Sequence, residues 1–177
     1  LIQSLAQCGL KKFIFLSSIK VLGDRSPSIG FSNFSCPDPQ SRYAVSKLSA
    51  ETALRLEAEK FDVQLVIMRM PVVYGPEMKG NFLRLFDLVN MGIPIPVSQD
   101  NKRAQLAIYN LSDFVRHALM PDFESTGVYN ICDGEQPSSY ELVRLISSSL
   151  RKPFRPIVCS MKAQKLIASV PIAGSLM

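Results

Sequence analysis

The chain has 177 residues, of which 47% are hydrophobic and 20% are charged, so it has enough apolar material for the core of one globular domain or two small ones. The high apolar fraction excludes a fully disordered chain, the glycine count of only 9 excludes a collagen-like repeat, and the four widely spread cysteines exclude a disulfide scaffold. The formal net charge of +5 indicates an anionic partner, but the basic residues are scattered without a nucleic-acid-binding motif, so we expect no nucleic acid partner.

Short apolar segments dominate the first part of the chain. Leu1 to Gly9 has the pattern of the last turns of an amphipathic helix closed by a glycine. Since the sequence opens inside this helix and closes in an apolar stretch without a polar cap, we expect a fragment truncated at both ends. The unbroken apolar runs Phe13 to Leu16 and Val63 to Met68 predict two strands, and such runs are typical of parallel strands buried on both faces.

A helix is predicted between these strands, over Tyr43 to Lys60, because this segment has no glycine or proline and follows the breaker-rich residues Cys36 to Gln40. Strand, helix and strand form a βαβ unit with a right-handed crossover. The helix has two apolar stripes at helical spacing, which are Val45, Leu48, Thr52 and Leu56, and Ala50, Ala53, Leu54 and Ala58. We expect one stripe to face the sheet and the other to face a second subunit, in a homodimer of the full-length protein.

After Gly75-Pro76 the predicted elements become shorter, which indicates a second region. Helices are expected at Asn81 to Asn90, Ser112 to Leu119 and Ser139 to Leu150, the last of them capped by Ser138 or Ser139. Strands are expected at Ile93 to Val97, Leu106 to Tyr109 and Gly127 to Cys132.

Cysteine and histidine do not form a metal-binding pattern in this sequence. The four cysteines, none of them in a CxxC pair, are Cys8, Cys36, Cys132 and Cys159. With His117 as the single histidine, we expect no bound metal. Without a disulfide pattern or a secretory leader, a reducing cytoplasmic location is expected. We also expect no membrane span, because the longest apolar stretch, Leu166 to Met177, is shorter than the roughly 20 residues needed and is interrupted by Pro171.

Tyr43 and Lys47 lie four residues apart on the predicted helix, so their side chains project from one face about one turn apart. A neighbouring ammonium favours the ionised form of a phenol, and this pairing would let Tyr43 act as a general acid or base. The alternative is an amphipathic tyrosine beside a solvated lysine, which is the commoner situation on helices. A second feature is needed to choose between them.

Ser17 and Ser18 supply that feature, because they stand where the first predicted strand ends. Ligands bind at the carboxyl ends of the strands in open parallel sheets. A hydroxyl there would hydrogen-bond a substrate oxygen beside the Tyr43 hydroxyl, whereas the alternative is a pair of turn or capping serines. The strand, the serines and the Tyr-x-x-x-Lys helix, in this order, predict a site made of an alcohol, a phenol and an ammonium.

Four segments resemble successive motifs of the extended short-chain dehydrogenases/reductases, the NAD-dependent nucleotide-sugar epimerases and dehydratases typified by UDP-glucose 4-epimerase. They are FIFLSSIKVLGD (13–24), SRYAVSKLSAE (41–51), VIMRMPVVYGP (66–76) and RAQLAIYNLSD (103–113). The resemblance implies an α/β fold in which residues 1–75 are the second half of a doubly wound parallel Rossmann-type sheet, without its glycine-rich first half. Residues 76–177 would mainly form part of a smaller α/β nucleotide-sugar-binding domain, with 104–120 returning to the Rossmann domain.

The resemblance also implies roles for individual residues. Ser18 matches the catalytic Ser/Thr position, Tyr43 the general acid/base, and Lys47 the residue that binds the nicotinamide ribose. Ser17, Tyr43 and Lys47 would contact the cofactor. Asn81 and Arg103 match positions that hold the nucleotide diphosphate, and a helix N-terminus and a guanidinium both suit phosphate oxygens. The plainer alternative makes Asn81 an N-cap and Arg103 a surface charge.

The function implied by the resemblance is that of a 4-epimerase, which uses NAD, or alternatively NADP, for hydride transfer at C4 of a nucleotide-diphosphate sugar. Two residues depart from the family pattern: Val72 stands where many members carry Asn, and Leu22 stands where Tyr is frequent. The valine favours a 4-keto-sugar reductase as the alternative function. A non-catalytic nucleotide-sugar-binding module is a third hypothesis. Because no G-x-G-x-x-G occurs in these 177 residues, we expect this chain alone to be inactive and to bind NAD weakly.

Overall fold

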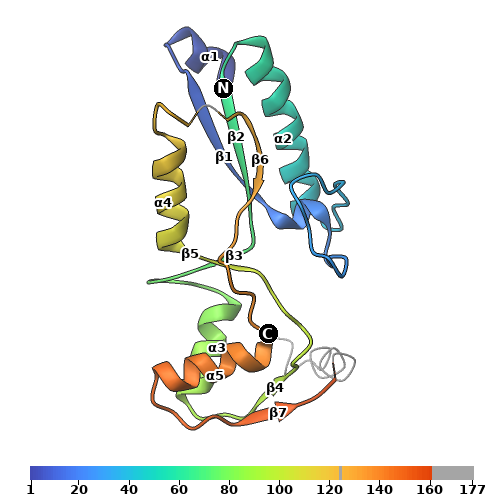
Figure 1. Cartoon of the computed structure of the whole chain (residues 1–177), viewed down its shortest axis with the longest axis vertical. Helices are drawn as coiled ribbons and strands as arrows, with labels where there is room; N and C mark the ends of the chain where they lie inside the picture. The colour runs from blue at the N-terminus through green and yellow to red at the C-terminus, as the bar shows by residue number, and fades with distance from the viewer. Residues whose placement is uncertain (124, 161–177) are drawn as a thin grey trace. The chain divides into compact units, whose positions relative to one another are not determined.

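The computed structural model describes residues 1–123 and 125–160, and the chain divides into two compact units (Figure 1). The first unit comprises residues 1–73 and 106–132, and the second comprises residues 74–105 and, within the described part of the chain, 133–160. The chain therefore leaves the first unit, builds part of the second, and returns before it leaves again.

A three-stranded parallel sheet forms the centre of the first unit. Its strands, in the spatial order β1-β2-β6, are β1 (Lys12–Ser18), β2 (Gln64–Met70) and β6 (Gly127–Asn130). Every residue of β2 from Leu65 to Arg69 is buried, as expected for a central strand that is covered on both faces. The two strands predicted from unbroken apolar runs are confirmed.

Helices cover both faces of this sheet (Figure 1). They are α1 (Ile2–Gln7) and α2 (Arg42–Lys60) on one face and α4 (Ile108–Ala118) on the other. Leu65 and Ile67 belong to the apolar cluster on the α2 side, whereas Val66 and Met68 belong to the cluster on the α4 side. This alternation follows from the two-residue period of a strand, and it gives the first unit three layers.

One predicted boundary is wrong. The strand expected at Leu106 to Tyr109 ends early, because β5 (Gln105–Ala107) stops at residue 107 and α4 begins at residue 108 rather than at 112. Ile108 packs in the apolar cluster on the α4 side, which supplies a reason for the helix to start there. No side chain caps the helix at Ala107, so its start carries no capping signal in the sequence.

The second unit pairs two helices with a small sheet. Its elements are α3 (Asn81–Asn90), β4 (Ile95–Val97), α5 (Ser139–Ser149) and β7 (Pro156–Val158). β4 and β7 run parallel, and the helices pack with them around a cluster that includes Val97 and Val143. Ser138, rather than Ser139, caps α5, because its Oγ accepts a hydrogen bond from the Glu141 N–H at 3.2 Å.

The remaining elements are short. They are the 3-10 helix η1 (Ile19–Leu22) and the strand β3 (Val72–Tyr74), which pairs with β5. The predicted end of α1 is confirmed, since Gly9 has a φ of 89° and the Leu10 N–H donates to the Leu5 oxygen at 3.0 Å. Among the described residues no helix is long and apolar enough to cross a bilayer, and the stretch Leu166 to Met177 lies outside them.

Candidate active site

The predicted Tyr-x-x-x-Lys helix is α2, and it begins beside the carboxyl end of β1. Ser41 caps the helix, since its Oγ accepts a hydrogen bond from the Ala44 N–H at 3.2 Å. Tyr43 is the second residue of the helix and is 55% exposed. Lys47 follows about one turn later on the same face. The phenol is therefore held on a rigid element while its ring stays accessible to solvent.

The Lys47 ammonium connects this helix to β1. Its Nζ donates a hydrogen bond to the Leu16 backbone oxygen at 3.0 Å. The same nitrogen lies 5.0 Å from the centroid of the Phe15 ring and 5.9 Å from the centroid of the Tyr43 ring. A cation at these distances is attracted to the electron-rich face of an aromatic ring. The structure thus brings Tyr43 and Lys47 together at the end of the strand that carries Ser17 and Ser18.

Ser18 and Ser17 make different contacts, although they are neighbours on β1. The buried Ser18 caps η1, because its Oγ accepts a hydrogen bond from the Lys20 N–H at 3.3 Å. This bond uses an oxygen lone pair, so the Ser18 hydroxyl hydrogen is left for another acceptor. The Ser17 Oγ instead donates to Glu51 Oε1 at 2.5 Å, inside the protein. The cofactor contact expected of Ser17 stays a prediction, and its hydroxyl has a structural partner.

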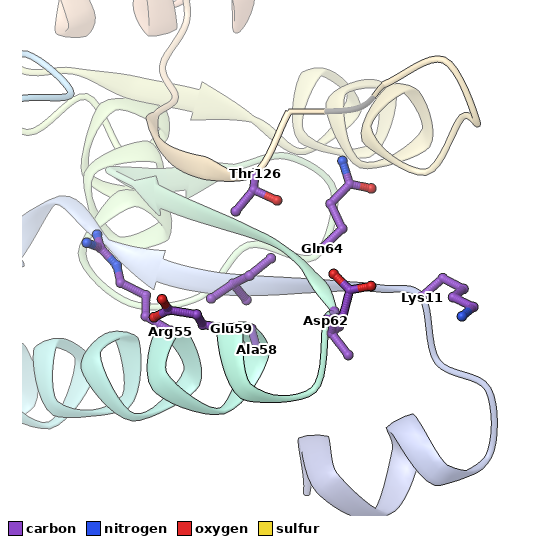
Figure 2. Close-up of a pocket in the computed structure, with 9 residues that line it drawn as sticks. Lys11, Arg55, Ala58, Glu59, Asp62, Gln64 and Thr126 are labelled. Carbon is purple, nitrogen blue, oxygen red and sulfur yellow. The ribbon is translucent and has the colours of Figure 1, made fainter.

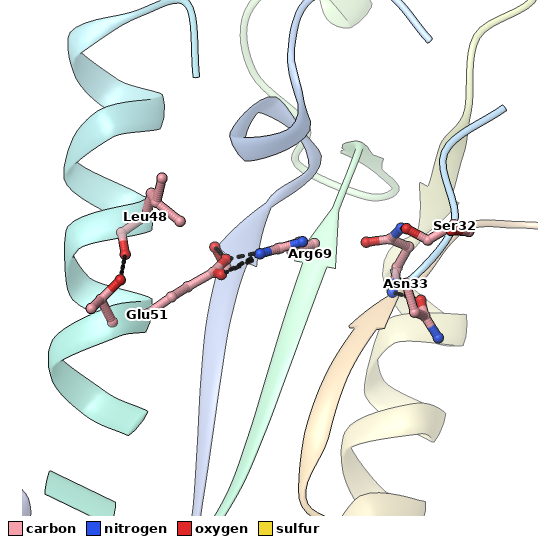
Figure 3. Close-up of polar contacts among 8 residues, drawn as sticks. Ser32, Asn33, Leu48, Glu51 and Arg69 are labelled. Carbon is pink, nitrogen blue, oxygen red and sulfur yellow. Dashed lines mark hydrogen bonds and ion pairs between the residues drawn. The ribbon is translucent and has the colours of Figure 1, made fainter. Parts of the chain in front are cut away.

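A buried ion pair that the sequence did not predict joins α2 to β2 in the same unit (Figure 3). Arg69 Nε donates to the Glu51 oxygens at 3.0 and 3.2 Å, and Arg69 Nη2 donates to Glu51 Oε2 at 2.6 Å. The two side chains are only 4% and 1% exposed. A signal was available, because Arg69 directly follows the apolar run Val63 to Met68 and is the one charged residue among residues 63–70, and a buried charge needs a partner.

The two residues predicted to hold a diphosphate belong to the second unit. Asn81 is exposed and is the first residue of α3, where Gly80 with its φ of 79° is the N-cap, so the alternative of an Asn81 cap is wrong. Arg103 is also exposed, and its backbone N–H donates to the Pro137 oxygen at 3.3 Å. Since Tyr43 and Lys47 belong to the first unit, the binding role of Asn81 and Arg103 stays a prediction.

A surface hollow of about 700 Å³ lies at the opposite edge of the same sheet (Figure 2). Lys11 and Gln64 line it at the amino ends of β1 and β2, together with Glu59 and Asp62 from the end of α2 and its following turn. Ligands of open parallel sheets bind at the carboxyl edge, and charges of both signs line this hollow. It is therefore separate from the candidate site.

Comparison with known proteins agrees with the motifs. The model of the NAD dependent epimerase/dehydratase family matches residues 1–132. The UDP-glucose 4-epimerase of Vibrio cholerae is 35% identical over 175 residues, which cover 95% of this chain and 53% of that protein. The chain thus spans about half the length of the curated relatives it matches.

Two solved structures illustrate the similarity of fold. The UDP-glucuronic acid 4-epimerase from Bacillus cereus in complex with NAD has a TM-score of 0.75 and 25% identity, covering 99% of this chain and 60% of that one. The UDP-N-acetylglucosamine 4-epimerase from Methanobrevibacter ruminantium M1, in complex with UDP-N-acetylmuramic acid, has a TM-score of 0.78 and 21% identity, covering 90% and 53%. The second similarity concerns the fold alone.

Proposed function

Because the chain belongs to the NAD-dependent epimerase/dehydratase family, we propose that it is part of a nucleotide-sugar 4-epimerase in which Tyr43 carries the proton of the C4 hydroxyl. The family membership expected from the motifs is confirmed, and the fold is a partial Rossmann-like α/β arrangement with parallel strands. The observation that carries the proposal is the meeting of Tyr43 and Lys47 at the carboxyl end of β1.

The groups at this edge fit the ribose of a nicotinamide cofactor, for which we propose NAD, with NADP as the alternative. An ammonium has three N–H donors, and the Leu16 oxygen accepts one of those of Lys47, so the others are available to ribose hydroxyls. The cofactor, when bound, supplies hydride acceptance and donation at C4. The chain supplies the position, the proton and a positive charge.

Proton transfer is the part of the reaction that we assign to this chain. The ionised Tyr43 phenol would take the proton of the C4 hydroxyl and return it in the reverse half of the reaction. Ser18, with its hydroxyl hydrogen available, would donate to the same sugar oxygen and hold it in line. Asn81 and Arg103 would bind the diphosphate through helix-end N–H groups and a guanidinium.

A homodimer of the full-length protein is also proposed, on the strength of the outer face of α2. Val45 is 48% exposed and Leu56 is 65% exposed, although both are large and apolar. Exposed apolar side chains that share one helix face are typical of a surface that another subunit covers.

A 4-keto-sugar reductase is the alternative, and Val72 favours it. This residue is 60% exposed on β3, at the position where many family members carry Asn, and a valine side chain cannot donate the hydrogen bond of an amide. The two functions differ in the state of their cofactor. A full-length protein that retains oxidised NAD through purification supports the epimerase, and one that needs added reduced cofactor for each turnover supports the reductase.

The proposal is tested by Tyr43→Phe in the full-length protein, assayed on a panel of UDP- and dTDP-hexoses. We expect kcat to fall by about 10²- to 10⁴-fold, because general acid/base catalysis is lost, while binding of the sugar nucleotide is retained. Tyr109→Phe is the matched control, since Tyr109 is 67% exposed on α4. Undiminished turnover by Tyr43→Phe would refute the assigned role. Binding without turnover by the unmodified protein would support the non-catalytic module.

A second test concerns this chain by itself. Calorimetric titration of NAD into the 177-residue chain should give no binding in the micromolar range, because the sequence lacks the glycine-rich turn that cradles the pyrophosphate. Micromolar affinity would contradict this prediction and would show that the 177 residues bind NAD without the glycine-rich turn.

A further inference from the structure

We propose that Glu51, Arg69 and Ser17 are positioning residues, whose buried contacts fix the orientation of α2 so that Tyr43 and Lys47 meet the end of β1 in the reactive geometry. The inference rests on the proposed function for the meaning of that geometry. Its structural content, a helix held by one carboxylate against two strands, stands on the contacts of the first unit alone.

One carboxylate joins three elements of the first unit. Ser17 on β1 and Arg69 on β2 are opposite each other in the parallel register, and both donate hydrogen bonds to Glu51 of α2. Figure 3 shows the Glu51 side chain reaching from α2 to the guanidinium. Because the donors stand on adjacent strands, the carboxylate fixes the helix both along the strands and across them.

The link at Glu51 lies one helical turn from the link at Lys47. Lys47 is bonded to the Leu16 oxygen at 3.0 Å, and Glu51 is bonded to Ser17, the next residue of the strand, at 2.5 Å. A single link would let the helix rotate about its point of attachment. Two links, at neighbouring residues of one strand and at successive turns of one helix, fix the rotation as well as the position. Tyr43 lies one further turn toward the start of α2, so the orientation of the helix also sets the position of its phenol.

Packing alone does not require charged groups here. Replacing a buried ion pair with apolar residues of similar volume is often neutral or stabilising, because both charges lose hydration on burial. Apolar contacts are non-directional, whereas a guanidinium and a carboxylate joined by parallel hydrogen bonds have a defined distance and angle. Glu51 and Arg69 therefore supply orientation, which an apolar substitute would lack.

The test is the double variant Glu51→Leu/Arg69→Met in the full-length protein, which removes both charges and keeps the volume. We expect kcat for the nucleotide sugar to fall by about 10- to 100-fold, as for a misplacement of about 1 Å, with KM within about twofold and the thermal midpoint preserved. Glu59→Gln, an exposed glutamate of the same helix, is the control and should change neither constant. A folded double variant whose kcat stays within about twofold of the unmodified protein overturns the inference.

Amide hydrogen exchange gives a second measurement that needs no turnover. In the 177-residue chain the double variant should exchange the amides of residues 44–48 about tenfold faster, while those of β2 keep their protection. Unchanged exchange at 44–48 overturns the inference. A full-length protein that turns over no nucleotide sugar refutes the proposed function only, and the exchange result then decides the positioning role. If the double variant does not fold, Ser17→Ala is read by the same two measurements, with a decrease in kcat of about 3- to 10-fold expected.

Discussion

The two units attach their helices by different kinds of polar contact. In the first unit the contact is ionic and buried, between Glu51 and Arg69. In the second unit uncharged groups join α5 to the end of β4: Ser139 Oγ accepts from the Ser98 N–H at 2.8 Å and donates to the Ser98 oxygen at 3.1 Å. An unpaired buried charge costs far more than an unpaired hydroxyl. The first unit therefore depends more heavily on single residues, and it is also the unit that holds Tyr43.

The largest effect on stability is expected from Arg69→Met, which leaves the Glu51 carboxylate buried without its charged partner. Breaking one side of a buried ion pair typically costs about 3 to 5 kcal/mol, so the first unit should lose that much free energy of unfolding, measured by urea denaturation at pH 7. Arg55→Met, on the exposed side of α2, is the control. A loss below about 1 kcal/mol for Arg69→Met would remove the contrast between the units.

A smaller effect is expected from Lys12→Met, in the first unit as well. The Lys12 ammonium donates to the backbone oxygens of Ala118, Met120 and Phe123 at 2.8, 3.0 and 2.9 Å, and so it joins the start of β1 to the last residue of α4 and to the turn that follows this helix. Methionine keeps the apolar stem and removes the donors. We expect a loss of about 1 to 2 kcal/mol in urea denaturation, because hydrogen bonds to charged groups are of this order. The exposed neighbour Lys11→Met should lose much less.

The sequence predicted the elements of the first unit better than the faces they bury. Both strands and α2 follow from apolar runs and from the absence of helix breakers. The buried residues of α2, however, are Ala44, Glu51 and Ala58, and of these only Ala58 belongs to a predicted stripe. A search for apolar periodicity excludes charged residues in advance, so it could not find a buried face with Glu51 at its centre.

The candidate site was predictable only in part, for a related reason. Tyr43 and Lys47 are four residues apart, and helical geometry alone brings their side chains together. Ser17 and Arg69 are distant in sequence from Glu51, and their contact depends on the strand register. Local spacing carries no information about such a contact. The lone arginine in an apolar strand indicates that a partner exists and does not say which residue it is.

The smallest effect on stability is expected in the second unit, where the charged group is an exposed carboxylate rather than a buried ion pair. The Ser138 N–H and the Ser138 hydroxyl donate to the Glu141 carboxylate. These hydrogen bonds lower the pKa of Glu141 below its ordinary value, and the backbone hydrogen bond has the larger effect. A carboxyl whose pKa is lower in the folded state than in the unfolded state stabilises the fold above the unfolded pKa. That stabilisation is lost as the pH falls through the folded pKa.

Glu141→Gln should therefore remove a small part of the acid sensitivity of the second unit. The measurement is the thermal midpoint from pH 7 down to below the ordinary glutamate range, where the unmodified chain and the variant should converge. Glu135→Gln, at an exposed residue outside α5, should keep the pH dependence of the unmodified chain. Because Glu141 is itself exposed, solvent screens the effect, and it should be far smaller than the loss caused by Arg69→Met. If Glu141→Gln and Arg69→Met changed stability equally, burial of the charged groups would not explain a difference between the two units.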